Sequence, residues 1–377
     1  MGAPSSSQGF STESYFQTQR PPTGLKEKSD RMHGFVEKWK AVKGKKVVLV
    51  TSGGTTVPLE SNTVRFLDNF SAGTRGATSA EYFLSQGYAV IFLHRLHSLR
   101  PFSRHYSHSL NPFLDLLSIV PSESDSSSSI VVSPEHTKSL LPILQAYHEA
   151  QSSGSLLSVE FQTVNDYLWL LKAVTASMAS LGRRGMFYLA AAVSDFFLPE
   201  EKVAEHKIQS NKGTLSLEMD QVPKVLKPLV QEWTPEGYIV SFKLETDPQL
   251  LIPKSRAALS RYGHQLVIGN ELHRRKYEVV FVERNSHSST ARPEKGSGDD
   301  RIKGTETPPI VEFAESNKFD VNGLVQKEEY KEMWLRLDDL KDGAAVAGKG
   351  RDDEVEIEEL IIKELLNRHQ RWIDAKE

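Results

Sequence analysis

The sequence contains no cysteine among its 377 residues. That absence excludes disulfide bonds, thiolate metal sites and a cysteine nucleophile, and it argues against a small secreted protein held together by disulfides. The sequence also lacks an apolar run long enough to cross a membrane, and the polar residues 1–22 contain no apolar segment of the kind found in signal peptides. We therefore expect a cytoplasmic protein without a membrane partner.

Charge of one sign is not in excess either. The 46 Lys and Arg residues nearly balance the 49 Asp and Glu residues, so the net charge is −3 and the pI is near 6.5. Because no basic stripe is present, we expect no nucleic-acid partner. Hydrophobic residues make up 38% and charged residues 25% of the chain, which is typical of a globular protein with some disordered segments.

Apolar, β-branched stretches alternate with helical patterns along most of the chain. This alternation predicts a mostly parallel sheet with helices on both faces, the Rossmann-like three-layer α/β/α class. Proteins of this class bind ligands where the carboxyl ends of the strands meet. The predicted strands cover residues 45–54, 88–95, 186–196, 238–247, 265–270 and 277–284, and the predicted helices cover residues 76–86, 164–182, 222–233, 248–263 and 354–373.

Two polar segments interrupt the alternation, and we expect both to lie on the surface because long polar insertions cost little stability. Residues 96–160 are rich in Ser, His and Pro. Residues 286–350 have the composition of a largely disordered insertion, with an isolated helix expected over QKEEYKEMWLRL. The expected organisation is a flexible leader with a short helix over residues 1–44, one α/β domain over residues 45–285 and 351–377, and these two insertions.

The first predicted strand ends in SGGTT, where Gly53 and Gly54 permit close backbone approach because glycine has no Cβ. The loop matches neither G-x-G-x-x-G nor G-x-x-x-x-G-K-[ST], so it is neither the dinucleotide fingerprint nor a P-loop. Taken alone, the two glycines are equally consistent with a tight turn after a strand.

A second glycine-rich loop, NFSAGTRGATSA, leads directly into a predicted helix. Asn69, Ser71 and Gly73 precede the helix start, where free N–H groups and the helix dipole attract an anion. Arg75 adds a guanidinium group suited to phosphate. Ordinary capping by Ser71 or Thr74 would explain one hydroxyl, but not the whole combination, so we predict an anion-binding site.

Three further segments contain candidate ligand-binding residues near strand ends or on a loop. In AAAVSDF, Ala191 and Ala192 leave room for a ligand against the backbone, and Asp195 is the candidate metal ligand. In SFKLETD, Phe242 is placed to stack on a base. In EHKIQSNKG, Lys207 lies on a predicted flap able to close on phosphates. For each residue the alternative is a structural role as a cap, in the core or on the surface.

Six segments stand out in order along the chain: VLVTSGGTTVPLE (48–60), VRFLDNFSAGTRGATSAEYFLSQGY (64–88), YLAAAVSDFFLP (188–199), EHKIQSNKG (205–213), VPKVLKPLV (222–230) and SFKLETDP (241–248). Together, in this order, they resemble the phosphopantothenoylcysteine synthetases, also called phosphopantothenate–cysteine ligases. The DNFSAG and SFKLETD segments resemble the eukaryotic branch. In the bacterial branch the synthetase usually follows a flavin-dependent decarboxylase, and the residues before the first strand are too few for such a domain. We therefore expect a monofunctional synthetase.

The resemblance implies an enzyme of coenzyme A biosynthesis that joins 4′-phosphopantothenate to L-cysteine. In this family the substrate carboxylate attacks the α-phosphate of a nucleoside triphosphate, and pyrophosphate leaves. The amine of cysteine then displaces the nucleotide and forms an amide. The eukaryotic branch mainly uses ATP with Mg²⁺, and CTP is the bacterial alternative. The resemblance also implies a homodimer whose sites are shared between chains, with a dimerisation extension beside the α/β core.

The resemblance also gives roles to residues at matching positions. Asn69 matches the asparagine that contacts the acyl nucleotide, and Lys207 matches the flap lysine needed to form the intermediate. Both are therefore the predicted catalytic residues. The rest of the predicted site comprises the nucleotide-binding residues Gly53, Gly54, Ala191, Ala192, Asp195 and Phe242, and the residues Ser71, Gly73 and Arg75 for an anionic phosphate group.

Two alternatives remain open from the sequence. An NAD(P)-dependent Rossmann oxidoreductase shares the strand–loop–helix start, although G-x-G-x-x-G and a Tyr-x-x-x-Lys pair are missing. A non-catalytic nucleotide-binding homologue is the second alternative. Such a homologue is expected to lose its charged site residues, whereas Asn69, Asp195 and Lys207 are all present.

Overall fold

The computed structural model describes residues 10–62, 64–106, 113–121, 128–209, 213–285, 329–338 and 355–375. The strands of its central sheet are β1 (Val47–Ser52), β4 (Ala89–Arg95), β7 (Leu156–Phe161), β8 (Gly185–Leu189), β11 (Tyr238–Glu245), β12 (Leu266–Glu271), β13 (Glu278–Arg284) and β14 (Tyr330–Arg336). The helices are α1 (Thr12–Thr18), α2 (Leu25–Lys40), α3 (Thr74–Ser85), α4 (Pro134–Ser153), α5 (Val164–Met178), α6 (Leu226–Pro228), α7 (Pro248–Tyr262) and α8 (Ile357–Asp374).

The sheet has eight strands in the order β14-β13-β12-β11-β8-β1-β4-β7. All neighbours from β12 to β7 run parallel, whereas β13 and β14 pair antiparallel at one edge. The connections β1–α3–β4 and β11–α7–β12 each join two adjacent strands through a helix, whereas β7–α5–β8 crosses over β4 and β1. This architecture confirms the predicted mostly parallel α/β class.

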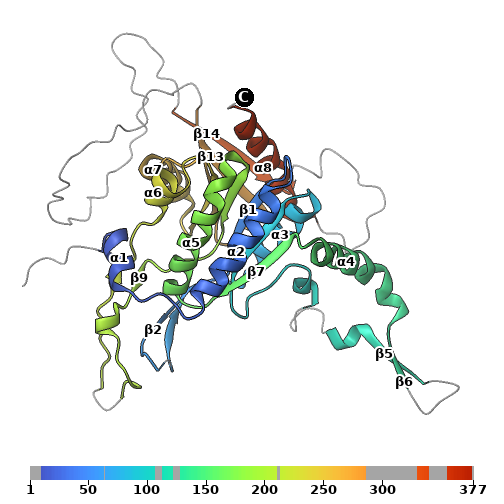
Figure 1. The fold of residues 1–377 in the computed structure, drawn as a ribbon, viewed down its shortest axis with the longest axis horizontal. Coiled ribbons are helices and arrows are strands. Elements are labelled where there is room, and N and C mark those ends of the chain that lie inside the picture. The colour runs from blue at the N-terminus through green and yellow to red at the C-terminus, as the bar shows by residue number, and fades with distance from the viewer. Residues whose placement is uncertain are drawn as a thin grey trace, which may run out of the picture.

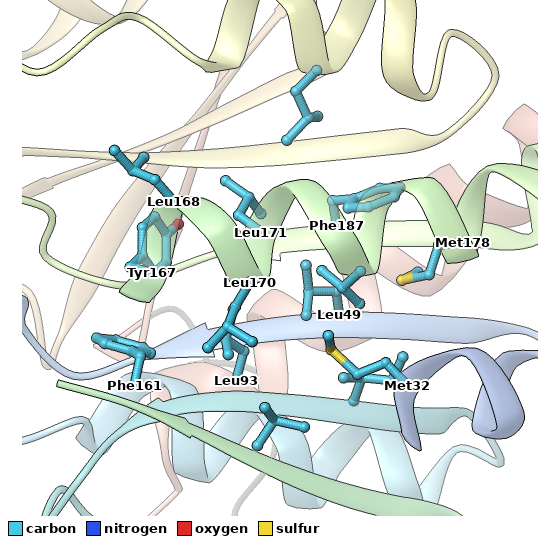
Figure 2. Packing of buried hydrophobic residues seen from close by; sticks show 14 of the residues in the cluster. Met32, Leu49, Leu93, Phe161, Tyr167, Leu168, Leu170, Leu171, Met178 and Phe187 are labelled. Carbon is cyan, nitrogen blue, oxygen red and sulfur yellow. The ribbon is translucent and has the colours of Figure 1, made fainter. Parts of the chain in front are cut away.

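Helices cover both faces of the sheet because each presents an apolar stripe to it. On one face α2 and α5 pack on the sheet, with Met32, Leu171 and Phe187 buried together (Figure 2). On the other face α3 and α8 bury Ala77 and Ile361 against the strands. Every residue of β1 is buried, because its alternate side chains enter the two layers.

The amino-terminal part of the chain is ordered, and the expectation of a flexible leader over residues 1–44 is wrong for its described part. α2 packs on α5 and β7, and α1 packs on α5 through Phe16 and Trp169, with Tyr15 and Met32 completely buried. The Tyr15 hydroxyl also donates a hydrogen bond to Oδ1 of Asn165 at 3.0 Å. Half of the residues of α2 are charged, so the composition of this segment concealed its narrow apolar stripe.

The segment QKEEYKEMWLRL is not a helix where the structure describes it. Its residues Tyr330–Arg336 form β14, which pairs antiparallel with β13 over seven residues. Met333 and Leu335 point toward the α8 layer, while Glu332 on the opposite face forms an ion pair with Arg256 of α7. Pairing with a neighbouring strand thus overrides the helix propensity of Lys and Glu. The remaining residues expected to be disordered, 286–328 and 339–350, lie outside the described residues.

The expected insertion over residues 96–160 is shorter than predicted, because β7 at Leu156–Phe161 is an edge strand of the main sheet. Before it, β5 (Leu117–Pro121) and β6 (Ser128–Val132) form a separate two-stranded sheet, followed by α4. This hairpin and α4 extend away from the central sheet (Figure 1). Across the described ranges, no helix has the length and apolar character needed to cross a membrane.

Candidate active site

A cleft of about 640 Å³ opens at the carboxyl ends of β8, β11 and β12. The loop before α3 forms part of its wall, and α5 with residues 222–229 forms another part. This is the edge at which ligands of parallel α/β proteins bind. Of the predicted site residues, the cleft is lined by Ser71, Gly73, Arg75, Ala191, Ala192, Asp195 and Phe242.

The two glycine-rich loops lie in direct backbone contact behind this cleft. A Cβ on Gly54 would lie 1.6 Å from the carbonyl oxygen of Asn69, and a Cβ on Gly76 would lie 2.4 Å from Cβ of Ser52. Gly53 has φ of +83°, a left-handed conformation that favours glycine. Gly53 and Gly54 therefore pack the loops together and are not among the residues that line the cleft.

Helix α3 begins at the cleft without a side-chain cap. Its N-cap residue is Gly73, with φ of +84°, so the alternative in which Ser71 or Thr74 caps the helix is wrong. The Ser52 hydroxyl at the end of β1 donates a hydrogen bond to the Gly73 carbonyl at 3.0 Å and so fixes the loop before α3 against this strand. The first turn of α3 therefore has no side-chain cap, and Ser71, Gly73 and Thr74 at the start of this helix line the cleft.

Arg75 lines the cleft, but protein groups already bind its guanidinium. Nη1 donates to Oε1 of Glu358 at 3.0 Å, Nη2 donates to the Arg275 carbonyl, and the group lies 5.9 Å from the centre of the Phe242 ring. Burial raises the pKa of Glu358, and the charge of Arg75 opposes that rise. To hold a phosphate as predicted, Arg75 would have to bind it while also forming the ion pair with Glu358.

Replacing Arg75 by methionine is expected to lower the free energy of unfolding by about 3 kcal/mol at pH 7, because it leaves a buried carboxylate without its cation. The pKa of Glu358 should rise further in the variant. The loss should therefore shrink as the pH falls through that pKa and the carboxyl becomes neutral. Urea unfolding at pH 7 and pH 5 measures both effects, and adding Glu358→Gln to Arg75→Met should restore part of the stability at pH 7. An equal loss at both pH values would contradict this account.

The two predicted catalytic residues lie outside the cleft lining in this structure. Lys207 is exposed on the segment that follows η4 (Glu200–Lys202). Asn69 is half-buried, and its backbone N–H donates to the Thr55 carbonyl at 3.1 Å. The structure therefore does not place either residue among those that line the cleft with Ala191, Ala192 and Asp195. Lys212, the other lysine of this flap, lies outside the described residues.

A buried carboxylate anchors the segment that carries Lys207. Glu60 accepts hydrogen bonds from the backbone N–H of Ile208 at 3.3 Å and from the backbone N–H and Nε of Arg65, both at 3.1 Å. Desolvation raises the pKa of Glu60, but these hydrogen bonds and the charge of Arg65 outweigh it and lower that pKa. The anchor fixes residue 208 and leaves the neighbouring Lys207 side chain in solvent.

The cleft also contains cationic and polar residues that sequence reasoning did not assign. Lys224 lies 3.7 Å from Asp195, and the amino group of Lys243 lies 3.1 Å from Glu245. Asn270 ends the predicted strand 265–270, and Lys243 lies at the polar end of the predicted strand 238–247, so both could be found from those positions, whereas Lys224 gave no such signal. Within the residues that the structure describes, no group of three His, Cys, Asp or Glu side chains forms a metal site. The unassigned polar lining residues are Lys224, Ser241, Lys243, Tyr262, Asn270, Arg275, Lys276 and Glu358.

The sheet and its cleft define a Rossmann-like α/β protein with basic residues at the carboxyl edge, and comparison with known proteins narrows this class. Residues 155–297 match the family described as DNA/pantothenate metabolism flavoprotein C-terminal domain. Phosphopantothenate–cysteine ligase CAB2 of Saccharomyces cerevisiae is 39% identical over 382 residues, which cover 96% of this chain and 86% of the yeast protein. The human phosphopantothenate–cysteine ligase is 49% identical over 249 residues, 65% of this chain and 78% of the human protein.

A solved structure of a relative also matches this chain along most of its length. A variant of Cab2 in complex with phosphopantothenate-cysteine matches with a TM-score of 0.72 at 39% identity, covering 97% of this chain and 99% of that chain. The chain therefore belongs to the phosphopantothenate–cysteine ligase family, as its sequence motifs predicted. This membership makes it a ligase and excludes the oxidoreductase alternative.

Proposed function

We propose that this protein joins 4′-phosphopantothenate and L-cysteine into 4′-phosphopantothenoylcysteine in coenzyme A biosynthesis, through an acyl-adenylate formed from ATP. The observation that carries the proposal is the cleft at the carboxyl edge of the sheet in a chain that matches ligases along most of its length. There the uncapped start of α3, the small-residue end of β8 and several lysines meet. Such a site suits two anionic substrates and an extended nucleotide.

In the first half-reaction, a carboxylate oxygen of 4′-phosphopantothenate attacks the α-phosphorus of ATP, and pyrophosphate leaves. Two anions must approach each other, so neutralising their charge and holding them in line should supply much of the rate. Lys224 and Lys243 of the cleft lining provide cationic charge. We assign Lys207 to the same task once its segment closes, because its ammonium is exposed at the end of a long side chain beside the anchored Ile208.

In the second half-reaction, the amine of cysteine attacks the acyl carbon, the bond to AMP breaks, and an amide forms. The proton lost from the amine leaves with the AMP or enters solvent. This route needs no nucleophile from the protein, which agrees with a chain without cysteine. We place Asn69 beside the acyl group, where its amide would orient the carbonyl for attack.

Mg²⁺ would neutralise the phosphates and orient the leaving pyrophosphate. This metal is usually held by one or two carboxylates together with substrate phosphates, rather than by a complete protein cage. Asp195 fits that role, since it lines the cleft and is largely exposed, with Lys224 3.7 Å away. We propose Asp195 as the protein ligand of the substrate-bound ion.

We also propose that the protein acts as a homodimer in the cytoplasm. The antiparallel pair β2 (Thr56–Pro58) and β3 (Phe66–Asp68) exposes apolar side chains beside the Asn69 loop, with Phe66, Leu67 and Phe70 exposed by 45%, 41% and 86%. Exposed apolar clusters of this kind mark association surfaces. A partner chain on this surface would lie near Asn69 and Lys207, which are the residues that the isolated chain leaves outside the cleft.

Product analysis tests the proposed reaction. Purified protein is expected to release AMP and pyrophosphate from ATP only when 4′-phosphopantothenate, cysteine and Mg²⁺ are all present, with CTP compared in parallel. Release of ADP and phosphate would instead indicate an acyl-phosphate route. Folded dimer that turns over neither nucleotide would favour the non-catalytic homologue.

A further inference from the structure

A polar residue in the cleft lining and a buried histidine behind it form a pair that the proposed reaction does not use. Ser241 of β11 lines the cleft and is half-buried, and His264 follows α7 with only 2% of its surface exposed. Oγ of Ser241 lies 2.8 Å from Nε2 of His264. Nδ1 of His264 has no hydrogen-bond partner among the described residues, although it is buried.

The missing partner at Nδ1 decides which ring nitrogen of His264 carries the proton. Burial lowers the pKa of His264 to about 4, and the charge of Arg284 acts in the same direction, so the ring is neutral near pH 7. A buried N–H without an acceptor is rarer and more costly than an acceptor without a donor. The proton therefore belongs on Nε2, which donates to Ser241.

This arrangement fixes the direction in which the Ser241 hydroxyl donates. Because Nε2 of His264 donates to the Ser241 oxygen, the hydroxyl hydrogen is not used by the histidine. Ser241 lines the cleft, so that hydrogen is available to an acceptor atom of a bound ligand. The hydroxyl of a serine without such a partner could either donate or accept, whereas the hydrogen bond from His264 leaves the Ser241 hydroxyl to act as a donor.

The surroundings of Ser241 indicate which part of a ligand it meets. On this side of the sheet the cleft wall combines apolar and aromatic side chains with the ammonium groups of Lys224 and Lys243, whereas Ser71 and Arg75 lie at the start of α3, beyond the end of β8. Apolar walls with a few directed polar groups suit a flat heterocycle rather than a phosphate chain. The apolar and aromatic lining on this side comprises Tyr167, Leu168, Leu171, Leu229 and Tyr262.

We infer that Ser241, held by His264, is a specificity-determining residue that donates a hydrogen bond to an acceptor atom of the nucleobase. His264 acts through Ser241 and is a positioning residue. The inference rests on the proposed use of a nucleotide in this cleft. It adds a directed contact to the base and names the residue pair that supplies it.

Steady-state kinetics of Ser241 variants test the contact. Ser241→Ala should raise KM for ATP about fivefold with little change in kcat, the size expected for one neutral hydrogen bond. Ser241→Thr keeps the hydroxyl and should stay within about twofold of wild type. Ser255→Ala is the matched control, because its buried hydroxyl donates to the Leu251 carbonyl within α7. An unchanged KM in Ser241→Ala would overturn the inference.

Inorganic triphosphate distinguishes the base from the phosphates. As a competitive inhibitor it should bind wild type and Ser241→Ala equally well, since it has no base. Equal weakening of triphosphate and ATP in the variant would place the hydroxyl on the phosphate chain and overturn the assignment to the base.

Two histidine variants and one spectrum test the role of His264 without relying on turnover. His264→Gln places an amide N–H near the position of Nε2 and should keep KM close to wild type, whereas His264→Asn should not. In ¹⁵N NMR of the whole protein at pH 7, the His264 ring should be neutral with its proton on Nε2. A proton on Nδ1 would overturn the inference. If wild type used no nucleotide at all, the proposed function would fail, and the NMR result would still report on the pair.

Discussion

Replacing Lys207 by alanine should reduce formation of the acyl-adenylate by about 100-fold or more while leaving the binding of 4′-phosphopantothenate nearly unchanged. The reason is that the lysine is assigned to charge that develops in the transition state on the α-phosphate and the leaving pyrophosphate, and such interactions are worth about 3–4 kcal/mol. Exchange of labelled pyrophosphate into ATP measures the first half-reaction alone, and calorimetry measures binding.

Lys202 provides the matched control for this experiment. It lies on the same stretch of chain, but its ammonium is 3.0 Å from the carboxylate of Asp220 and outside the cleft lining. Lys202→Ala should keep the exchange rate of wild type. Should Lys207→Ala turn over at a near wild-type rate, the segment after β9 (Phe196–Phe197) has no catalytic role and the flap assignment is wrong.

The second large effect is expected for Gly54→Ala. The added methyl group would lie 1.6 Å from the Asn69 carbonyl oxygen, far inside contact distance, and both atoms belong to tightly packed backbone. One of the two loops must then move, at a cost of about 3 kcal/mol of unfolding free energy or more. Because the displaced loop carries Asn69 through Arg75, activity should fall with stability. Urea unfolding and product assays on one preparation measure both.

Gly34→Ala separates this clash from a general effect of replacing glycine. Gly34 lies inside α2, and a Cβ there would have open space within 4 Å. Alanine should therefore stabilise the protein by about 0.5–1 kcal/mol, because glycine is a poor helix former. A Gly54→Ala variant with a wild-type unfolding midpoint would show that the loops are not packed as described.

Local sequence patterns predicted the central part of the fold well. The β1 strand, the start of α3 and the order of later strands and helices follow from periodicity, because a buried parallel strand needs a continuous apolar run. The patterns failed where tertiary contacts decide the outcome. Half of the residues of α2 are charged, and β14 contains good helix formers, yet packing in the core fixes α2 and pairing with β13 fixes β14.

In the cleft, too, local patterns predicted some residues, whereas tertiary contacts determine others that the sequence did not reveal. Ser71, Gly73 and the alanines of residues 190–192 could be predicted, because they directly follow strands or precede a helix. The ion pair between Arg75 and Glu358 could not be predicted, because 283 positions separate the two residues in the sequence. Likewise Ser241 had no signal in the sequence, because its meaning depends on a histidine brought to it by the end of α7.

The docking of α8 on α3 also has a consequence for the order in which the molecule assembles. Contacts that join positions far apart in a chain require a large loss of chain entropy before they stabilise anything, and they tend to form late. The Arg75–Glu358 link is such a contact, and Glu358 is part of the cleft wall. A half-folded chain, with β1, α3 and β4 already paired, would therefore still lack one side of its ligand site. Binding of substrates would select only those chains whose carboxyl-terminal helix has already docked.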